Sequence, residues 1–134
     1  MSEPFQIIEG SVTAPRGFRA AGVFCDIKRL GKGTVIGRDG GPKRDLMLIA
    51  ADRPAAVAGM FTTNQVCAAP VKVSLRHARK ARAQAIVANS GNANACTGEQ
   101  GLRDAEAMVR ATAQALALPE RDVLVCSTGR IGLP

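Results

Sequence analysis

The sequence predicts a mixed α+β domain, in which a sheet-rich first half is followed by a strand, a helix and a second strand. Three observations predict this class. Small and apolar side chains recur at period two over residues 18–24, as they do in a half-buried strand. Residues 83–127 contain an apolar run, a long stretch of helical periodicity and another apolar run. The length of 134 residues, 46% of them hydrophobic, fits one domain with one core.

The first half is expected to be mainly extended. After the strand at residues 18–24, the glycine-rich and charged residues 31–45 predict an exposed hairpin or a flexible loop. Two apolar runs follow, "LMLIAAD" and "AAVAGMFTT", and Pro54 lies between them. Because proline interrupts helices and favours turns, we expect these two runs to form an antiparallel hairpin.

A short basic helix is expected next. Residues 70–73 look extended, and Ser74 is placed to cap a helix that ends near Ala81. His77, the single histidine, lies in this helix among arginine and lysine residues. These like charges favour a surface position for His77 over a catalytic or metal-binding role.

The second half gives the clearest pattern. "AQAIVANS" predicts a buried strand, and after a loop of glycine and asparagine a helix begins at Thr97, which forms a capping box with Gln100. We expect Pro119 to end this helix and "DVLVCS" to form the next strand, with Cys126 in the core. Apolar and small residues trace one face of the helix: Leu102, Ala105, Val109, Thr112 and Leu116.

The distribution of charge bears on whether the protein binds nucleic acid. The formal net charge is +7 and the pI is about 9.9, with basic residues concentrated at 28–32, 43–44 and 76–82. No tyrosine or tryptophan interleaves them, and no nucleic-acid-binding motif accompanies them. We therefore expect solvated loops and one basic helix, and no nucleic-acid partner.

The cysteines and the apolar runs bear on the compartment. The four cysteines are far apart, without a C-x-x-C pair or companion histidines, so we expect neither a metal site nor a disulfide framework. No apolar run approaches the roughly 18 residues that cross a bilayer. The acidic and proline residues of "MSEPFQIIEG" do not fit a signal peptide. We expect a soluble, cytoplasmic protein without a membrane partner.

Two loops at predicted strand ends are candidates for chemistry: "NSGNANACTG" and "STGRIG". Glycines there let a ligand approach the backbone, and the helix after the first loop adds partial positive charge at its start. Neither loop has the spacing of a phosphate-binding motif. Asn89, Asn92 and Asn94 have two open explanations, bracing of the loop or a place in the wall of a site.

Four stretches in order, "SVTAPRGFRAAGV", "MFTTNQVCAAPV", "NSGNANACTG" and "STGRIG", resemble the N-terminal part of the ornithine acetyltransferase (ArgJ) family. These proteins are glutamate N-acetyltransferases of arginine biosynthesis, and the resemblance extends from about Gly10 to Pro134. It implies the layered αββα fold of DmpA and ArgJ proteins, with a mixed sheet and helices on one face. Residues 1–134 would form a single, incomplete domain of the α chain.

The resemblance also implies a reaction. Family members cut their own precursor before a threonine, and that threonine, now the first residue of the β chain, carries acetyl from N-acetylornithine to glutamate. No cofactor or metal is implied, although some members also accept acetyl-CoA as a donor. The implied partners are the β chain, an assembly of αβ pairs and these small-molecule substrates.

Within this sequence, the residues that match the family's oxyanion hole are Thr128 and Gly129. The family usually has an apolar residue where Arg130 stands, and its cleavage motif and substrate-binding residues have no match here. We therefore expect the 134-residue chain alone to be inactive. Two rival functions stay open: a related self-cleaving aminopeptidase or hydrolase, and a non-enzymatic basic binding module.

Overall fold

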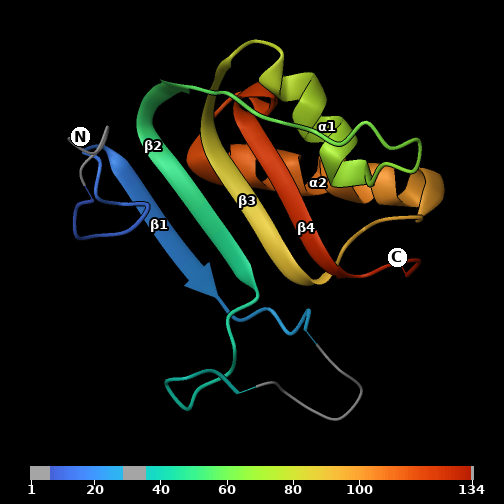
Figure 1. Cartoon of the computed structure of the whole chain (residues 1–134), viewed down its shortest axis with the longest axis horizontal. Coiled ribbons are helices and arrows are strands. Elements are labelled where there is room, and N and C mark those ends of the chain that lie inside the picture. The colour runs from blue at the N-terminus through green and yellow to red at the C-terminus, as the bar shows by residue number, and fades with distance from the viewer. Residues whose placement is uncertain (1–6, 29–35, 134) are drawn as a thin grey trace, which may run out of the picture.

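A four-stranded mixed sheet with two helices on one face forms the domain (Figure 1). The computed structural model describes residues 7–28 and 36–133. The strand order is β1-β2-β3-β4, with β1–β2 and β2–β3 antiparallel and β3–β4 parallel. The predicted α+β class is therefore confirmed. The elements are β1 (Phe18–Val23), β2 (Leu46–Ala56), α1 (Ala69–Ala78), β3 (Arg82–Asn92), α2 (Gly98–Leu116), a 3-10 turn (Glu120–Asp122) and β4 (Val123–Arg130).

The core lies between the two helices and the β3–β4 half of the sheet. Along β3 the residues alternate between buried and half-buried, because one face of the strand packs on the helices and the other stays open. Small side chains on α2, four residues apart, let that helix approach the sheet closely. The buried cluster comprises Ala69, Val73, Ala85, Val87, Ala105, Val109, Ala113, Val123 and Val125.

The helix α2 confirms the predicted apolar face at Ala105 and Val109, but its two ends differ from the prediction. The capping box is wrong, because the Thr97 hydroxyl donates to Asn94 and the Gln100 side chain binds Asp104 instead. The helix ends at Leu116 because Ala117 adopts a left-handed conformation, a common C-cap geometry, before the chain reaches Pro119.

The predicted hairpin around Pro54 is wrong. The strand β2 continues through this residue, and its two partners are β1 and β3. The pairing with β3 jumps from Ala50 to Ala55, so Pro54 lies in a bulge where no N–H is required for the ladder. Gln84 of β3 donates to the Ala51 carbonyl inside this bulge. The local sequence alone does not distinguish a proline in a strand bulge from a proline in a turn.

The helix α1 begins five residues before Ser74, with Pro70 in its first turn, where a missing N–H costs nothing. Ser74 is therefore not a cap. Its hydroxyl is buried and exchanges two hydrogen bonds with Val125, donating to the carbonyl at 2.6 Å and accepting from the N–H at 2.9 Å. His77 is half-buried rather than on the surface, with Nδ1 2.8 Å from the Val123 carbonyl oxygen. Helix α1 is thus fastened to β4.

Three other expectations have mixed outcomes. The predicted first strand exists, although β1 is mostly exposed. Residues 36–44 are largely exposed, with a bridge between Ile36 and Pro42, whereas residues 31–35 lie outside the described part. Cys126 is exposed on β4, so its predicted core position is wrong.

Within the described residues, no helix is both long and apolar enough to span a membrane.

Candidate active site

The ends of β3 and β4 meet at two glycines. Gly91 and Gly129 are register partners, and both have positive φ angles, of 127° and 136°. A Cβ atom on Gly129 would lie 2.5 Å from the Gly91 carbonyl oxygen, and one on Gly91 would lie 2.6 Å from the Ile27 carbonyl oxygen. Three backbone segments are therefore in direct contact, and only glycine fits at these two positions.

Thr128 lies on the open face of the sheet at this strand end. It is the register partner of Ser90, and alternation along both strands turns these two side chains away from the helices. Thr128 and Gly129 are both exposed, and the pairing around them is irregular, with Thr128 opposite both Ser90 and Asn92. A bulge of this kind redirects side chains at a strand end. A hydroxyl donor and a glycine amide are thus adjacent and accessible.

Ser127, the neighbour of Thr128, points the other way. Its hydroxyl is buried and has no hydrogen-bond partner in the part of the chain that the structure describes. The two consecutive hydroxyls therefore differ: one is exposed on the open face and the other is enclosed on the helix side.

The asparagine loop is braced by its own side chains, which confirms the first of the two explanations. Asn89 donates to the Asn92 carbonyl at 2.9 Å, and Asn92 accepts from the Asn94 N–H at 2.6 Å. Asn94 donates to the Gly101 carbonyl at 2.7 Å and accepts from Thr97 at 2.6 Å. Because the side chains of all three asparagines hold backbone or helix-start groups, this loop is a rigid support for the strand ends.

The same loop also holds the segment after β4. The Ala93 N–H donates to the Arg130 carbonyl and the Gly132 N–H donates to the Ala95 carbonyl, both at 2.8 Å. Asn92 adds a third bond, to the Leu133 carbonyl at 3.0 Å. Arg130, where the resemblance expects an apolar residue, is exposed, and its backbone pairs with Asn92 at the irregular end of β4.

A buried carboxylate that sequence reasoning missed fixes the other side of this site. Asp45 is only 3% exposed, and its two oxygens accept from the N–H groups of Cys25 at 2.7 Å and Lys28 at 3.0 Å. Its carbonyl accepts from the Ser90 N–H at 2.8 Å. Asp45 thus ties the turn after β1 to the end of β3. Nothing in the local sequence separates this aspartate from the other acids of its loop.

Asp45 is charged at neutral pH. Burial by itself would raise the pKa of this carboxyl, but backbone N–H donors, led by Cys25 and Lys28, outweigh that effect and hold the pKa below its ordinary value of 3.8. The Lys28 side chain then extends to Ser90, with Nζ 3.2 Å from the hydroxyl oxygen. One ammonium group therefore lies beside the register partner of Thr128.

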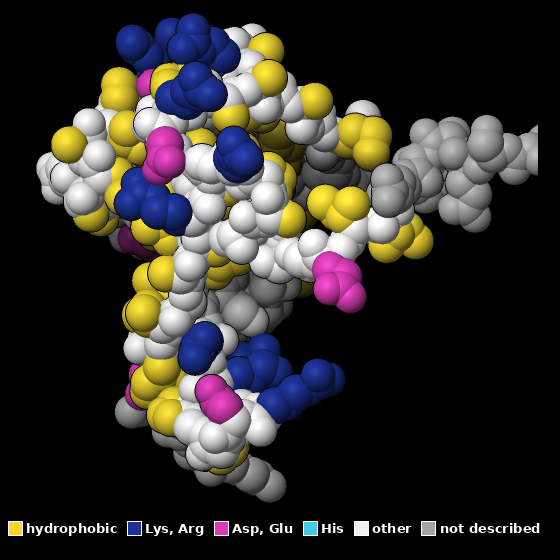
Figure 2. All heavy atoms as spheres, turned by 90° about the vertical axis from the view of Figure 1, so that its left-hand side faces the viewer, with side chains coloured by type: hydrophobic (Ala, Val, Ile, Leu, Met, Phe, Trp, Pro, Cys, Tyr) yellow, Lys and Arg dark blue, Asp and Glu magenta, His cyan; other side chains and the backbone are white. Residues whose placement is uncertain are grey.

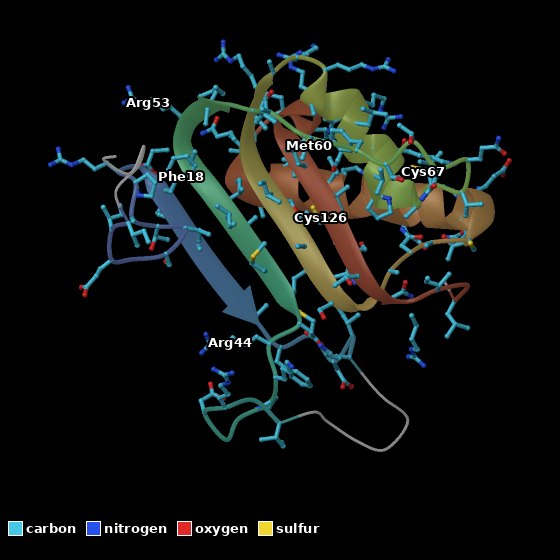
Figure 3. All side chains as sticks on the ribbon, in the orientation of Figure 1. Phe18, Arg44, Arg53, Met60, Cys67 and Cys126 are labelled. Atoms are coloured by element: carbon cyan, nitrogen blue, oxygen red, sulfur yellow. The ribbon has the colours of Figure 1, made fainter. Side chains whose placement is uncertain are left out.

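The four cysteine thiols do not form a cluster like that of the groups at the ends of β3 and β4. Cys67, before α1, and Cys126, on β4, lie well apart (Figure 3), and the four cysteines are free. Although Cys126 is exposed by surface area, enough protein surrounds its sulfur that burial raises the pKa of the thiol, which makes it a poor nucleophile at neutral pH. Within residues 7–28 and 36–133, no three His, Cys, Asp or Glu side chains are grouped closely enough to hold a metal ion.

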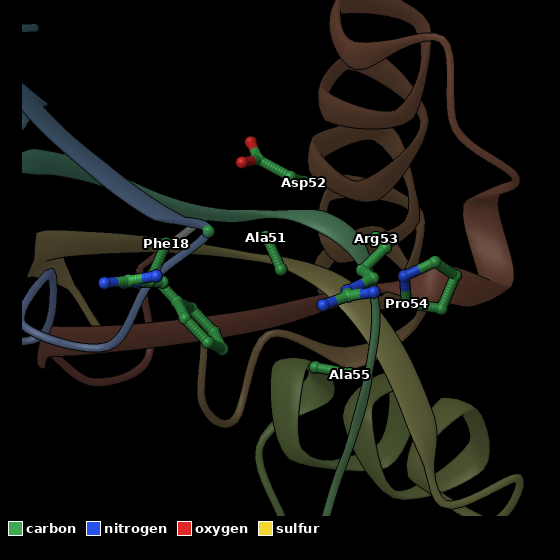
Figure 4. A pocket seen from close by; sticks show the side chains of 8 residues that line it. Phe18, Ala51, Asp52, Arg53, Pro54 and Ala55 are labelled. Carbon is green, nitrogen blue, oxygen red and sulfur yellow. The ribbon is translucent and has the colours of Figure 1, made fainter.

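The rest of the surface brings fewer functional groups together in one place. A hollow of about 450 Å³ lies at the opposite end of the sheet, between Phe18 and the bulge of β2 (Figure 4), and it contains none of the predicted site residues. On the face drawn in Figure 2, lysine and arginine side chains form separate groups with acids between them, rather than one continuous stripe. The strand ends at Thr128 and Gly129 therefore remain the best candidate site.

Comparison with known proteins gives one consistent result. The sequence model of the ArgJ family matches residues 20–134. The arginine biosynthesis bifunctional protein ArgJ of Caldanaerobacter subterraneus is 50% identical over 129 residues, which is 96% of this chain and 29% of that protein. The protein of the same name from Symbiobacterium thermophilum is 50% identical over 127 residues, covering 95% of this chain and 29% of that protein. The chain thus spans 29% of the length of these curated relatives.

Two solved structures are also similar. The ArgJ protein of Bacillus halodurans superposes with a TM-score of 0.81 at 40% identity, covering 92% of this chain and 59% of that one. The ornithine acetyltransferase of Mycobacterium tuberculosis, solved with ornithine, gives a TM-score of 0.78 at 44% identity, covering 91% and 61%. The comparison of structures and the comparison of sequences therefore point to the same kind of protein.

Proposed function

The chain belongs to the ArgJ family, and we propose that it supplies the oxyanion-binding part of a glutamate N-acetyltransferase of arginine biosynthesis. The reaction transfers acetyl from N2-acetyl-L-ornithine to L-glutamate, with acetyl-CoA as an alternative donor. One observation carries the proposal: an exposed hydroxyl and a glycine amide adjoin at Thr128 and Gly129, on a strand end whose backbone is fixed by direct contact.

The chemistry follows from this pair. A threonine of the β chain gives its hydroxyl proton to its own α-amine and attacks the acetyl carbonyl, whose oxygen becomes negatively charged in the tetrahedral intermediate. Collapse of that intermediate breaks the C–N bond, ornithine leaves with the proton, and the glutamate amine then takes the acetyl group from the threonine ester. The Thr128 hydroxyl and the Gly129 N–H donate hydrogen bonds to that oxygen. Because contact between Gly91 and Gly129 fixes the backbone before the reaction, little reorganisation is needed as charge develops. Each donor of this kind typically lowers the barrier by about 3 to 4 kcal/mol.

The open face of the sheet supports the proposed partner. Its side chains include Ile49, Ile86 and Cys126, which are half-buried or exposed and which no helix of the described chain covers. In a layered αββα fold a second sheet packs on such a face. We propose that the β chain supplies it, that αβ pairs assemble further, and that residues 1–134 act as one α-chain domain without a cofactor.

The test is Thr128→Ala in a complete ArgJ protein that carries this sequence. Turnover of N-acetylornithine with glutamate, measured as ornithine release, should fall about 100-fold or more. The unfolding midpoint should not change, because Thr128 is exposed. Ser127→Ala is the matched control, since its hydroxyl is enclosed and unpartnered among the described residues, and turnover should be kept.

Other outcomes of this assay identify the rivals. Unchanged turnover in the Thr128→Ala protein would remove Thr128 from the mechanism. Hydrolysis of N-acetylornithine without dependence on glutamate would favour a related self-cleaving hydrolase. Transfer by the 134-residue chain alone would contradict the proposal that the nucleophile lies on the β chain.

A further inference from the structure

We infer that Ser74 of α1 is a positioning residue for acetyl transfer, because it fixes the outer edge of β4, the edge that faces away from β3. This inference rests on the proposed function, since it explains how the donors Thr128 and Gly129 are held in their places. Ser74 touches no substrate. The sequence pattern predicted only a helix cap at this residue.

Ser74 takes the place of a neighbouring strand at the outer edge of β4. Its hydroxyl donates to the Val125 carbonyl at 2.6 Å and accepts from the Val125 N–H at 2.9 Å. Ser74 is 6% exposed and Val125 is 1% exposed. Water therefore has little access to these two backbone groups, and without the hydroxyl both would lose their partner. One side chain thus satisfies both polar groups of an edge-strand residue.

Helix α1 is held on both sides of Ser74, which makes it a firm support for this edge. At its start, the Ala69 N–H donates to the Asn94 carbonyl at 3.3 Å. Near its end, the Nδ1 atom of His77 lies 2.8 Å from the Val123 carbonyl oxygen. Figure 1 shows α1 running alongside β4, on the side away from β3. The same helix is therefore tied to the asparagine loop and to two residues of β4.

The oxyanion donors lie just beyond the last residue of β4 that α1 holds. Backbone groups alternate in direction along a strand, so the Gly129 N–H turns to the same outer edge as the N–H of Val125. Gly129 is exposed, which leaves its N–H accessible to a ligand. On the far side, the Arg130 carbonyl accepts from the Ala93 N–H at 2.8 Å. Both donors thus lie on a short stretch of β4 between two anchors.

Donors on such a stretch are sensitive to small shifts. A donor stabilises the oxyanion only when its N–H or O–H is aimed at the position of that oxygen, and a misplacement of about 1 Å can cost roughly 100-fold in rate. Removal of the Ser74 hydroxyl releases one of the two anchors but leaves both donors present. We therefore expect a loss of turnover smaller than the loss that follows removal of a donor.

The experiment is a double-mutant cycle in the complete protein, with ornithine release from N-acetylornithine and glutamate as the assay. Ser74→Ala should lower kcat about tenfold and change KM for N-acetylornithine less than about twofold, because no substrate contact is lost. In the Thr128→Ala background the same change should lower kcat about threefold or less, because one of the donors that Ser74 positions is already absent. Ser74→Cys keeps the size of the side chain but offers only weak hydrogen bonds, so it should behave like Ser74→Ala.

Val109→Ala is the matched control. Val109 is 1% exposed and packs in the same core from α2, without a bond to the edge of β4. This change should lower the midpoint of urea unfolding at least as much as Ser74→Ala does, yet keep kcat within about twofold. The comparison separates a loss of stability from a loss of donor position.

Each other result counts against the inference. An unchanged kcat in Ser74→Ala would mean that the edge needs no anchor, and full activity in Ser74→Cys would mean that packing matters and the hydrogen bonds do not. An equal loss in Val109→Ala, or an equal loss from Ser74→Ala in both backgrounds, would mean that Ser74 acts only on stability. In all these cases the unmodified protein still transfers acetyl, so the proposed function survives. An unmodified complete protein that transfers no acetyl would overturn the proposed function and this inference together.

Discussion

The middle and the ends of β3 and β4 are stabilised by different physics. In the middle, Val87, Val123 and Val125 are almost fully buried against the two helices, and apolar packing holds the strands in place. At the ends, side chains give way to backbone contacts at Gly91 and Gly129. Hydrogen bonds from aspartate and asparagine side chains to the backbone replace apolar contact there.

This difference separates stability from function along the same strands. A packed interior relaxes partly around a missing methyl group, so it tolerates small changes at moderate cost. Backbone in direct contact has no room for an added methyl group. The hydrogen bonds from the Cys25 and Lys28 N–H groups to the charged Asp45 carboxylate, here called the charged staple, depend on pH. The candidate site lies where the geometry is fixed most tightly, which is what preorganised donors require.

The largest expected effect tests the backbone contact. Gly129→Ala forces a methyl group into the Gly91 carbonyl at a φ angle of 136°, and we expect the free energy of unfolding to fall by about 4 kcal/mol or more. Urea unfolding measures it. Gly132→Ala is the control, because its φ is also positive, at 79°, yet nothing lies within 4 Å, so its cost should be about 1 to 2 kcal/mol. Equal costs would mean that strain in φ, and not contact, makes glycine necessary.

The second prediction concerns the charged staple. Asp45→Asn replaces one acceptor oxygen with a donor that faces an N–H group, so the free energy of unfolding at pH 7 should fall by about 3 kcal/mol. Because folding lowers the pKa of Asp45, its stabilisation is complete above the ordinary value of 3.8 and is lost as pH falls through the lower folded value. The difference between the two proteins should therefore shrink below about pH 3.8.

Urea unfolding at several pH values checks this prediction. Asp39→Asn is the matched control, because Asp39 is exposed and its ion pair with Arg44 spans 3.8 Å, so the variant should lose less than about 1 kcal/mol. A difference that stays constant down to pH 2 would show that Asp45 acts through shape rather than charge.

The same division decides how much the sequence could reveal. Three features were predictable: the buried strand β3, the following strand and the apolar face of α2. When one face of an element is buried, apolar residues recur every two residues in a strand and about every 3.6 residues in a helix. The strand ends were predictable only in part. The resemblance pointed to Thr128 and Gly129, but the contact of Gly91 with Ile27 joins residues far apart in sequence.

The errors at Pro54 and Ser74 share one physical cause, which is long-range contact overriding local preference. Pro54 favours a turn locally, but β2 continues through it because pairing with β1 and β3 requires a bulge there. Ser74 is a good cap by composition, yet its hydroxyl is used by the backbone of Val125, 51 residues away. The staple from Asp45 to Lys28 left no local signal for the same reason.

The smallest expected effect tests the apolar middle. Val125 is 1% exposed, and Val125→Ala should lower the free energy of unfolding by about 2 kcal/mol at every pH, because no titrating group is involved. Cys126→Ala, one residue along on the open face, should change it by less than about 0.5 kcal/mol in the isolated chain. In a complete αβ protein the cost of Cys126→Ala should rise, because the proposed second sheet would bury that side chain. If its cost in urea unfolding is the same in both proteins, the open face does not pack against the β chain at Cys126.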